Sequence, residues 1–216
     1  MTRPPHNPKS QAVPKRNPFI IPSAPVLKRQ PPSGPQWLHE VKFDGWRAQL
    51  HKAGDEVAIY TRKGRDYTKR FPAIRDSLLA LPTDSAIIDA DVCDSDGKPD
   101  FKALMDGATG DLCAWCFDLL EINGRGLRRR TLIERKAMLR HLLNKADDHV
   151  LRFSEPFQDP LKLLAAAEKA GLEGIVSKLG YQPYRSGKNP GWVKVKCCAW
   201  REANKDRWEM FQRGHG

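Results

Sequence analysis

The sequence predicts a single α+β domain in which short strands and helices follow one another irregularly. Three apolar runs with polar or glycine breaks lie between residues 37 and 61, and they indicate an antiparallel meander. Later segments have the apolar spacing of helices, yet strands and helices do not alternate as a βαβ repeat requires. Hydrophobic residues make up 40% of the 216 residues, which is enough for the core of one domain.

Seven segments are predicted as strands because they are apolar or alternating runs bounded by turn residues. Ala53-Gly54-Asp55 supplies the turn between the second and third strands, and Ser95-Asp96-Gly97 follows the fourth. In chain order the predicted strands are Trp37–Phe43, Arg47–Lys52, Glu56–Thr61, Ser85–Cys93, Leu112–Leu120, Gly174–Lys178 and Trp192–Cys197.

Three segments have the periodicity of amphipathic helices. The first, Phe71–Leu81, is stopped by Pro82. The second is Thr131–Leu143, where Thr131 followed three residues later by a glutamate forms a capping box. The third, Leu161–Ala170, ends at a glycine.

The domain is predicted to span residues 36–197, with a different composition on each side. Residues 1–35 hold ten of the seventeen prolines, which disfavours helices and central strands. We expect this basic arm to be partly disordered, over residues 1–17, while the more apolar Phe19–Leu27 lies against the domain. Residues 198–216 are predicted to be a short polar and basic tail.

The net charge of +11 suggests a polyanionic partner such as nucleic acid or a nucleotide. More than half of this excess lies in the N-terminal arm, because residues 1–39 contain six basic residues and no acidic one. No apolar run approaches the length of about 18 residues that a membrane helix needs. The odd number of cysteines and the absence of a secretory signal favour a reducing compartment, so we expect a cytoplasmic protein.

The strongest chemical signal is the segment Glu40–Arg47, which places a lysine, an aspartate and a glycine between two predicted strands. A lysine acts as a nucleophile only when its amine is neutral, and burial or neighbouring cations favour that form. On its own the pattern is also typical of a plain hairpin turn, because Asp-Gly is a common turn pair.

Two further signals lie near the C-terminal end, at Glu173–Lys178 and Trp192–Lys196. In a strand Lys194 and Lys196 point to the same face, and two ammonium groups repel each other unless an anion lies between them. A nucleotide phosphate is a natural counter-ion. The alternative is a solvated edge strand, but the intervening valines imply that one face is buried.

Together these segments resemble the covalent nucleotidyltransferases, and specifically the ATP-dependent DNA ligases. The likeness covers residues 36–197 and is greatest to the ligase domain of bacterial non-homologous end-joining enzymes. It implies the nucleotidyltransferase fold, with antiparallel sheets flanked by helices and the ATP site between them. Six segments carry it in the family's order: Lys42–Arg47, Thr61–Gly64, Ile88–Asp91, Phe117–Leu120, Glu173–Lys178 and Trp192–Lys196.

The resemblance implies a role for each residue that binds the nucleotide. Lys42 would attack the α-phosphate of ATP and form a lysyl-AMP. Glu40 would accept a hydrogen bond from the adenine amino group, and Phe117 would stack on the base. Arg47 and Arg62 would hold the ribose and the DNA phosphate.

The remaining residues that the resemblance implies would bind the phosphates or a divalent cation. Lys194 and Lys196 would neutralise the α-phosphate as charge builds on it. Glu173 and Asp91 would bind Mg²⁺ or Mn²⁺, because carboxylate oxygens suit these cations. Asp91 stands where the family has a glutamate, so its contact would need a water or a local shift.

The resemblance also implies partners. AMP would pass to the 5′-phosphate of nicked or broken double-stranded DNA, and the strand would be sealed in repair or recombination. The family continues into an OB-fold, which is not recognisable after Lys196, so we expect a separate OB-fold or end-joining protein, and a nucleoid-associated location. Two alternatives stay open: an RNA ligase or capping-type nucleotidyltransferase, and a catalytically weak or inactive DNA-binding module.

Overall fold

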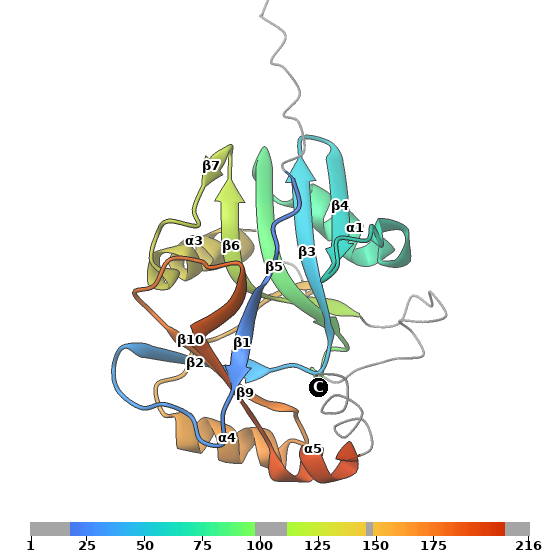
Figure 1. Ribbon diagram of the computed structural model, residues 1–216. Coiled ribbons are helices and arrows are strands. Elements are labelled where there is room, and N and C mark those ends of the chain that lie inside the picture. The colour runs from blue at the N-terminus through green and yellow to red at the C-terminus, as the bar shows by residue number, and fades with distance from the viewer. Residues whose placement is uncertain (1–17, 98–111, 146–148, 206–216) are drawn as a thin grey trace, which may run out of the picture.

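The strands of this protein form two sheets, as a computed structural model of residues 18–97, 112–145 and 149–205 shows (Figure 1). One sheet has six strands and the other has four. The predictions for residues 1–17 and 206–216 lie outside the described residues. None of the helices in the described ranges is long and apolar enough to cross a membrane.

The six-stranded sheet occupies the upper part of Figure 1. Its order is β4-β3-β5-β6-β7, and β8 lies beside β6. Its strands are β3 (Trp46–Ala53), β4 (Glu56–Thr61), β5 (Ser85–Cys93), β6 (Cys113–Ile122), β7 (Arg125–Gly126) and β8 (Leu151–Phe153). All neighbours are antiparallel except β6 and β8, which run parallel.

The four-stranded sheet has the order β1-β10-β9-β2. Its strands are β1 (Ser23–Leu27), β2 (Trp37–Lys42), β9 (Gly174–Leu179) and β10 (Gly187–Lys196). The β1–β10 pair is parallel, so both sheets are mixed and not purely antiparallel as expected. The apolar segment Phe19–Leu27 does lie against the domain, and it supplies β1.

The predicted three-stranded meander is wrong in its first strand. β3 and β4 pair as expected, but β2 pairs with β9 of the other sheet. The physical reason is that β2 and β3 contribute to different cores: Val41 packs in the cluster under the smaller sheet, and Leu50 in that under the larger. The turn after β2 therefore carries the chain from one sheet to the other.

Gly45 in that turn passes very close to β5. A Cβ atom there would lie 2.6 Å from the backbone oxygen of Val92, which is too close for any side chain. The Asp-Gly pair thus serves a crossing between sheets, which a hairpin turn does not.

Helices cover one side of each sheet. The helices α1 (Pro72–Ala80) and α3 (Leu132–Asn144) pack on the larger sheet, and α4 (Pro160–Lys169) packs on β9 and β2. A 3₁₀ turn spans Thr68–Arg70, and a short helix, α5 (Cys198–Ala203), follows β10. The predicted capping box of α3 is confirmed, because the Thr131 and Glu134 side chains each accept from the other's backbone N–H.

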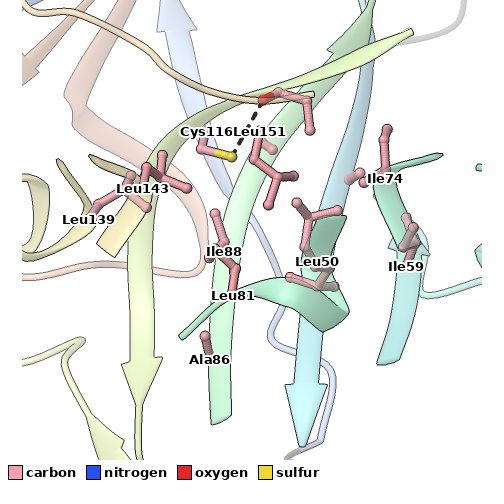
Figure 2. Close-up of a cluster of buried hydrophobic side chains, with 14 of the residues drawn as sticks. Leu50, Ile59, Ile74, Leu81, Ala86, Ile88, Cys116, Leu139, Leu143 and Leu151 are labelled. Carbon is pink, nitrogen blue, oxygen red and sulfur yellow. Dashed lines mark hydrogen bonds between the residues drawn. The ribbon is translucent and has the colours of Figure 1, made fainter. Parts of the chain in front are cut away.

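The main core lies between the larger sheet and its two helices. Figure 2 shows Leu50 and Ile88 from the strands facing Ile74 of α1 and Leu139 of α3, all of them buried. Burial of such side chains contributes about 1.5–3 kcal/mol each. This sheet is the rigid support on which β3 and β5 present their polar residues to the other sheet.

Candidate active site

A pocket of about 310 Å³ lies between the two sheets. Its walls come from strands of both sheets and from the segment that leads into β1. Five of the predicted site residues line it: Lys42, Arg47, Arg62, Asp91 and Lys194. Four of the five are cationic, so the pocket suits an anion with several negative charges.

Lys42 ends β2 and is held by a buried carboxylate. Its Nζ lies 2.5 Å from Oε2 of Glu173, and Oε1 of Glu173 lies 3.0 Å from Nζ of Lys196. Glu173 is 5% exposed, whereas the Lys42 side chain keeps 20% of its surface exposed. The strand pairing sets this contact, because Lys42 stands opposite Gly174 in the β2–β9 ladder.

Lys194 is the third lysine of this group. The pKa of Lys194 is lowered from its ordinary value, first by burial and then by the positive charges of Lys42 and Lys196. Among the described residues it forms no ion pair within 4.0 Å. As predicted, Val193 and Val195 are buried on the other face of β10, so Lys194 faces the pocket. An anion entering the pocket would relieve this repulsion.

A smaller inner pocket lies beside the first, and Glu40 and Phe117 line it as neighbours. The carboxylate of Glu40 is 1% exposed and lies between two lysines, with Lys136 Nζ at 3.0 Å and Lys178 Nζ at 2.9 Å. The Ser154 hydroxyl also donates a hydrogen bond to it, at 3.0 Å. Burial would raise the pKa of Glu40, but the two ammonium groups outweigh burial and lower it.

Two cations lie over the ring of Phe117. The guanidinium carbon of Arg47 is 4.4 Å from the ring centroid, and Lys178 Nζ is 4.3 Å from it. Phe117 is only 5% exposed, so a planar base could stack on it only after a neighbour moves. The inner pocket therefore holds the predicted adenine-binding residues in a closed arrangement.

Arg47 is fixed by a buried aspartate of β5. Its Nε and one terminal nitrogen donate to the two carboxylate oxygens of Asp89, at 2.5 Å each, and the Tyr184 hydroxyl donates to Asp89 at 2.8 Å. Asp91 stands opposite Arg47 in the β3–β5 ladder and lines both pockets. Burial raises the pKa of Asp91, against the opposing charges of Arg47 and Lys42.

The predicted metal ligands provide two carboxylates near Lys42. Within the described ranges no three His, Cys, Asp or Glu side chains cluster as metal ligands. Mg²⁺, however, is commonly bound by one or two carboxylates together with substrate phosphates and waters. Asp91 lines both pockets, whereas Glu173 lines neither of them and is paired with Lys42 and Lys196. A cation that arrives with the nucleotide would therefore meet Asp91 first.

The sequence did not point to Lys136, Ser154, Asp89 or Tyr184, although all four support predicted site residues. Asp89 stood within the segment Ile88–Asp91, so its position was a usable signal. Lys136 and Ser154 carried no such signal in the sequence. Lys136 looks like any other polar position of a helix, and Ser154 belongs to no recognisable motif.

Fold and pocket together define a class of protein. An α+β domain holds a lysine amine between two sheets, in a basic pocket that fits the phosphates of a nucleotide. Residues 26–196 match the family described as "ATP dependent DNA ligase domain". This chain therefore belongs to the ATP-dependent DNA ligase domain family.

Relatives of known sequence agree with this assignment. The multifunctional non-homologous end joining protein LigD of Pseudomonas aeruginosa is 38% identical over 186 residues, which cover 83% of this chain and 22% of LigD. A probable DNA ligase of Mycobacterium sp. (strain KMS) is 33% identical over 170 residues, covering 74% of this chain and 33% of that ligase. This chain thus spans about a fifth to a third of the length of these relatives.

Solved structures share the fold. A mycobacterial DNA ligase D complexed with ATP superposes with a TM-score of 0.69 at 26% identity, covering 82% of this chain and 60% of the other. The Chlorella virus DNA ligase–adenylate, at 12% identity and a TM-score of 0.57, covers 83% of this chain and 69% of its own, and shows likeness of fold alone. The predicted nucleotidyltransferase fold and the likeness to end-joining ligases are confirmed.

Proposed function

We propose that this chain is an ATP-dependent DNA ligase-type nucleotidyltransferase in which Lys42 accepts AMP. The observation that carries the proposal is the amine of Lys42 in a pocket between two sheets, with Glu173 at 2.5 Å and further cations around it. A lone lysine on a surface would have neither the carboxylate partner nor the anion-binding surroundings.

In the first step the Lys42 nitrogen attacks the α-phosphorus of ATP. The Lys42 ammonium first gives one proton to Glu173, which lies at hydrogen-bond distance, and becomes a neutral amine. A nitrogen–phosphorus bond then forms, the bond to the pyrophosphate oxygen breaks, and the nitrogen loses its second proton to solvent. Asp91 and Glu173 are the residues that would hold a divalent cation, which would supply charge neutralisation for the leaving pyrophosphate.

The other residues bind and orient the nucleotide. Lys194, Lys196 and Arg62 neutralise the phosphates, and repulsion between the first two is relieved when the anion arrives. Phe117 stacks on the adenine once a covering cation has moved, and Glu40 accepts from the base while its lysine partners fix its position. Arg47 reaches the ribose from its place on Asp89.

In the later steps AMP passes to a 5′-phosphate of nicked or broken DNA, and the adjacent 3′-hydroxyl displaces it to seal the strand. The net charge of +11 supports a nucleic-acid substrate. We further propose that a separate OB-fold or end-joining protein assists sealing, and that the chain works at the cytoplasmic nucleoid.

Covalent labelling tests the first step. The purified protein is treated with pyrophosphate, incubated with α-labelled ATP and Mg²⁺ or Mn²⁺, denatured, and separated on a gel. We expect acid-labile label on the wild type and none on Lys42→Ala or on Lys42→Arg, which keeps the charge. Unlabelled ATP should compete and GTP should not. Competition by GTP would point to a capping-type enzyme, and sealing of nicked RNA alone to an RNA ligase.

A second candidate function follows from the closed inner pocket. Because Arg47 and Lys178 lie over Phe117, the chain could bind DNA without activating ATP. Such a binding module would shift nicked DNA in a gel and would stay unlabelled with either metal.

A further inference from the structure

The short helix α5 brings a tryptophan to the turn that follows the nucleophile. Residues 198–203 lie beyond the span that matches the ligase family. The indole Nε1 of Trp200 donates to Oδ2 of Asp44 at 3.2 Å. The Nζ of Lys196 lies 3.8 Å from the centroid of the Trp200 ring.

Four hydrogen bonds hold α5 in place. The carboxylate of Glu168 on α4 accepts from the backbone N–H groups of Cys198, at 2.9 Å, and Ala199, at 2.7 Å. The N–H of Cys197 donates to the backbone oxygen of Glu173 at 2.9 Å, and the Arg201 guanidinium donates to that of Lys196 at 3.0 Å. Two of these bonds join the start of the helix to α4, and the other two reach the backbone of Glu173 and Lys196, the residues that pair around Lys42.

Two routes connect Trp200 to the nucleophile. Through its ring it contacts Lys196, which pairs with Glu173, which in turn pairs with Lys42. Through its N–H it holds Asp44, two residues after Lys42 in the chain. An indole is the aromatic group that binds cations best, and it can also donate a hydrogen bond. Phenylalanine could serve only the first route.

We propose that Trp200 is a positioning residue for the adenylation of Lys42, an inference that rests on the proposed function. The ring face restricts the long Lys196 side chain to the side where Glu173 and an arriving phosphate lie. The N–H holds the Asp44 turn, and with it the end of β2. Both contacts are made by residues of the chain itself, so they restrict Lys196 and the Asp44 turn without help from the nucleotide.

Single-turnover labelling with saturating ATP tests this on three variants. Trp200→Phe keeps a ring over Lys196 and loses the hydrogen bond, so we expect a rate roughly threefold below wild type. Trp200→Ala loses both contacts, and we expect a fall on the order of tenfold or more. The control, Glu202→Gln, changes an exposed side chain of the same helix and should label at the wild-type rate.

Two further readouts separate positioning from general stability. The ATP concentration at half-maximal rate should change less than the maximal rate, because Trp200 contacts the reacting lysines through Lys196 and does not line the pocket. Melting temperatures identify variants that are merely unfolded, and Trp200→Phe remains informative if Trp200→Ala does not fold. Equal maximal rates for folded wild type and both variants would overturn the inference while leaving the proposed function intact.

The contact between Trp200 and Asp44 can also be tested by the indole N–H signal of Trp200 in an NMR spectrum, which does not depend on activity. The chain has six tryptophans, and the indole N–H signal of Trp200 is the one that disappears in Trp200→Phe. Asp44→Asn should shift that signal selectively. If the wild type takes no label, the proposed adenylation fails, and the positioning role fails with it. In that case a shifted indole signal would show that the contact between Trp200 and Asp44 exists but only supports the fold. An unshifted signal would contradict the contact itself.

Discussion

At the scale of single residues, Glu40 lies in an unusual balance of charge. Its one carboxylate is paired with two buried ammonium groups, those of Lys136 and Lys178. Replacing it with glutamine leaves both lysines buried without an anion. Removing one partner of a buried ion pair typically destabilises a protein by about 3–5 kcal/mol. We expect Glu40→Gln to lose stability of this order in urea denaturation.

The matched control is Glu155→Gln, which breaks the exposed ion pair with Arg140. Exposed pairs contribute at most about 1 kcal/mol, so this variant should unfold close to the wild type. A similar small loss for both variants would show that Glu40 is not responsible for holding its two lysines.

The lowered pKa of Lys194 predicts how the stability of the protein depends on pH. Its pKa is lowered in the folded protein, so the folded chain binds fewer protons than the unfolded chain between the two pKa values, and stability rises with pH there. Below that window the repulsion with Lys42 and Lys196 is fully present. Lys194→Met should therefore melt at a higher temperature than wild type at neutral pH, while labelling more slowly. The difference in melting temperature should shrink as pH approaches about 10.4, the unfolded value.

Sequence reasoning named candidate site residues that the structure brings together, and it did not name the residues that support them. Lys42, Glu173, Lys194 and Lys196 meet as the motif order predicts, because strand pairing brings their segments together. Lys136 could not be foreseen, since its burial depends on α3 packing across β6 and on the approach of Ser154. The individual roles of the site residues remain predictions that labelling and mutagenesis must test.

At the scale of elements, most strands and helices were predictable because each has a clear period and clear ends. The capping box began α3 one residue after Thr131, and β5 has the predicted bounds. The partner of β2 was not predictable, because pairing with β9 joins segments more than 130 positions apart. Local pattern favours a hairpin with β3, and only the two separate cores decide against it.

Gly174 lies where β9 packs closely against β10, and a substitution there tests that packing. Its φ is +152°, and a Cβ there would lie 2.0 Å from the backbone oxygen of Val195. Gly174→Ala must therefore push β9 away from β10 and displace Glu173. We expect a loss of stability of roughly 1–3 kcal/mol and slower labelling. Gly126→Ala is the control, because a Cβ there meets nothing within 4 Å and its melting temperature should hardly change.

At the scale of the whole molecule, the structure redefines the basic N-terminal arm. Residues 23–27 form β1 and residues 22–25 line the pocket, so only residues 1–17 can be removed without touching the described fold. Four of the six basic residues before His39 lie in that stretch. If they contact DNA phosphates, removing them should weaken binding to nicked DNA at low salt.

The salt dependence of DNA binding gives the number of phosphate contacts that the deletion removes. Each lost phosphate contact should flatten the slope of log affinity against log salt by about 0.9. The shorter deletion should melt like wild type, whereas deletion of residues 1–28 removes β1 and should lower the melting temperature. Unchanged affinity at low salt in the shorter deletion would mean that the arm does not bind DNA.

The distance along the chain between Lys42 and Glu173, 131 positions, has a consequence during synthesis. A ribosome adding roughly 5–20 residues per second needs on the order of ten seconds to make the intervening segment. Throughout that interval the nascent chain carries Lys42 without the strands β9 and β10, which supply part of the pocket wall. If Lys42 accepts AMP as proposed, it can do so only after translation has passed residue 196, and covalent label would then mark chains whose last strands have docked.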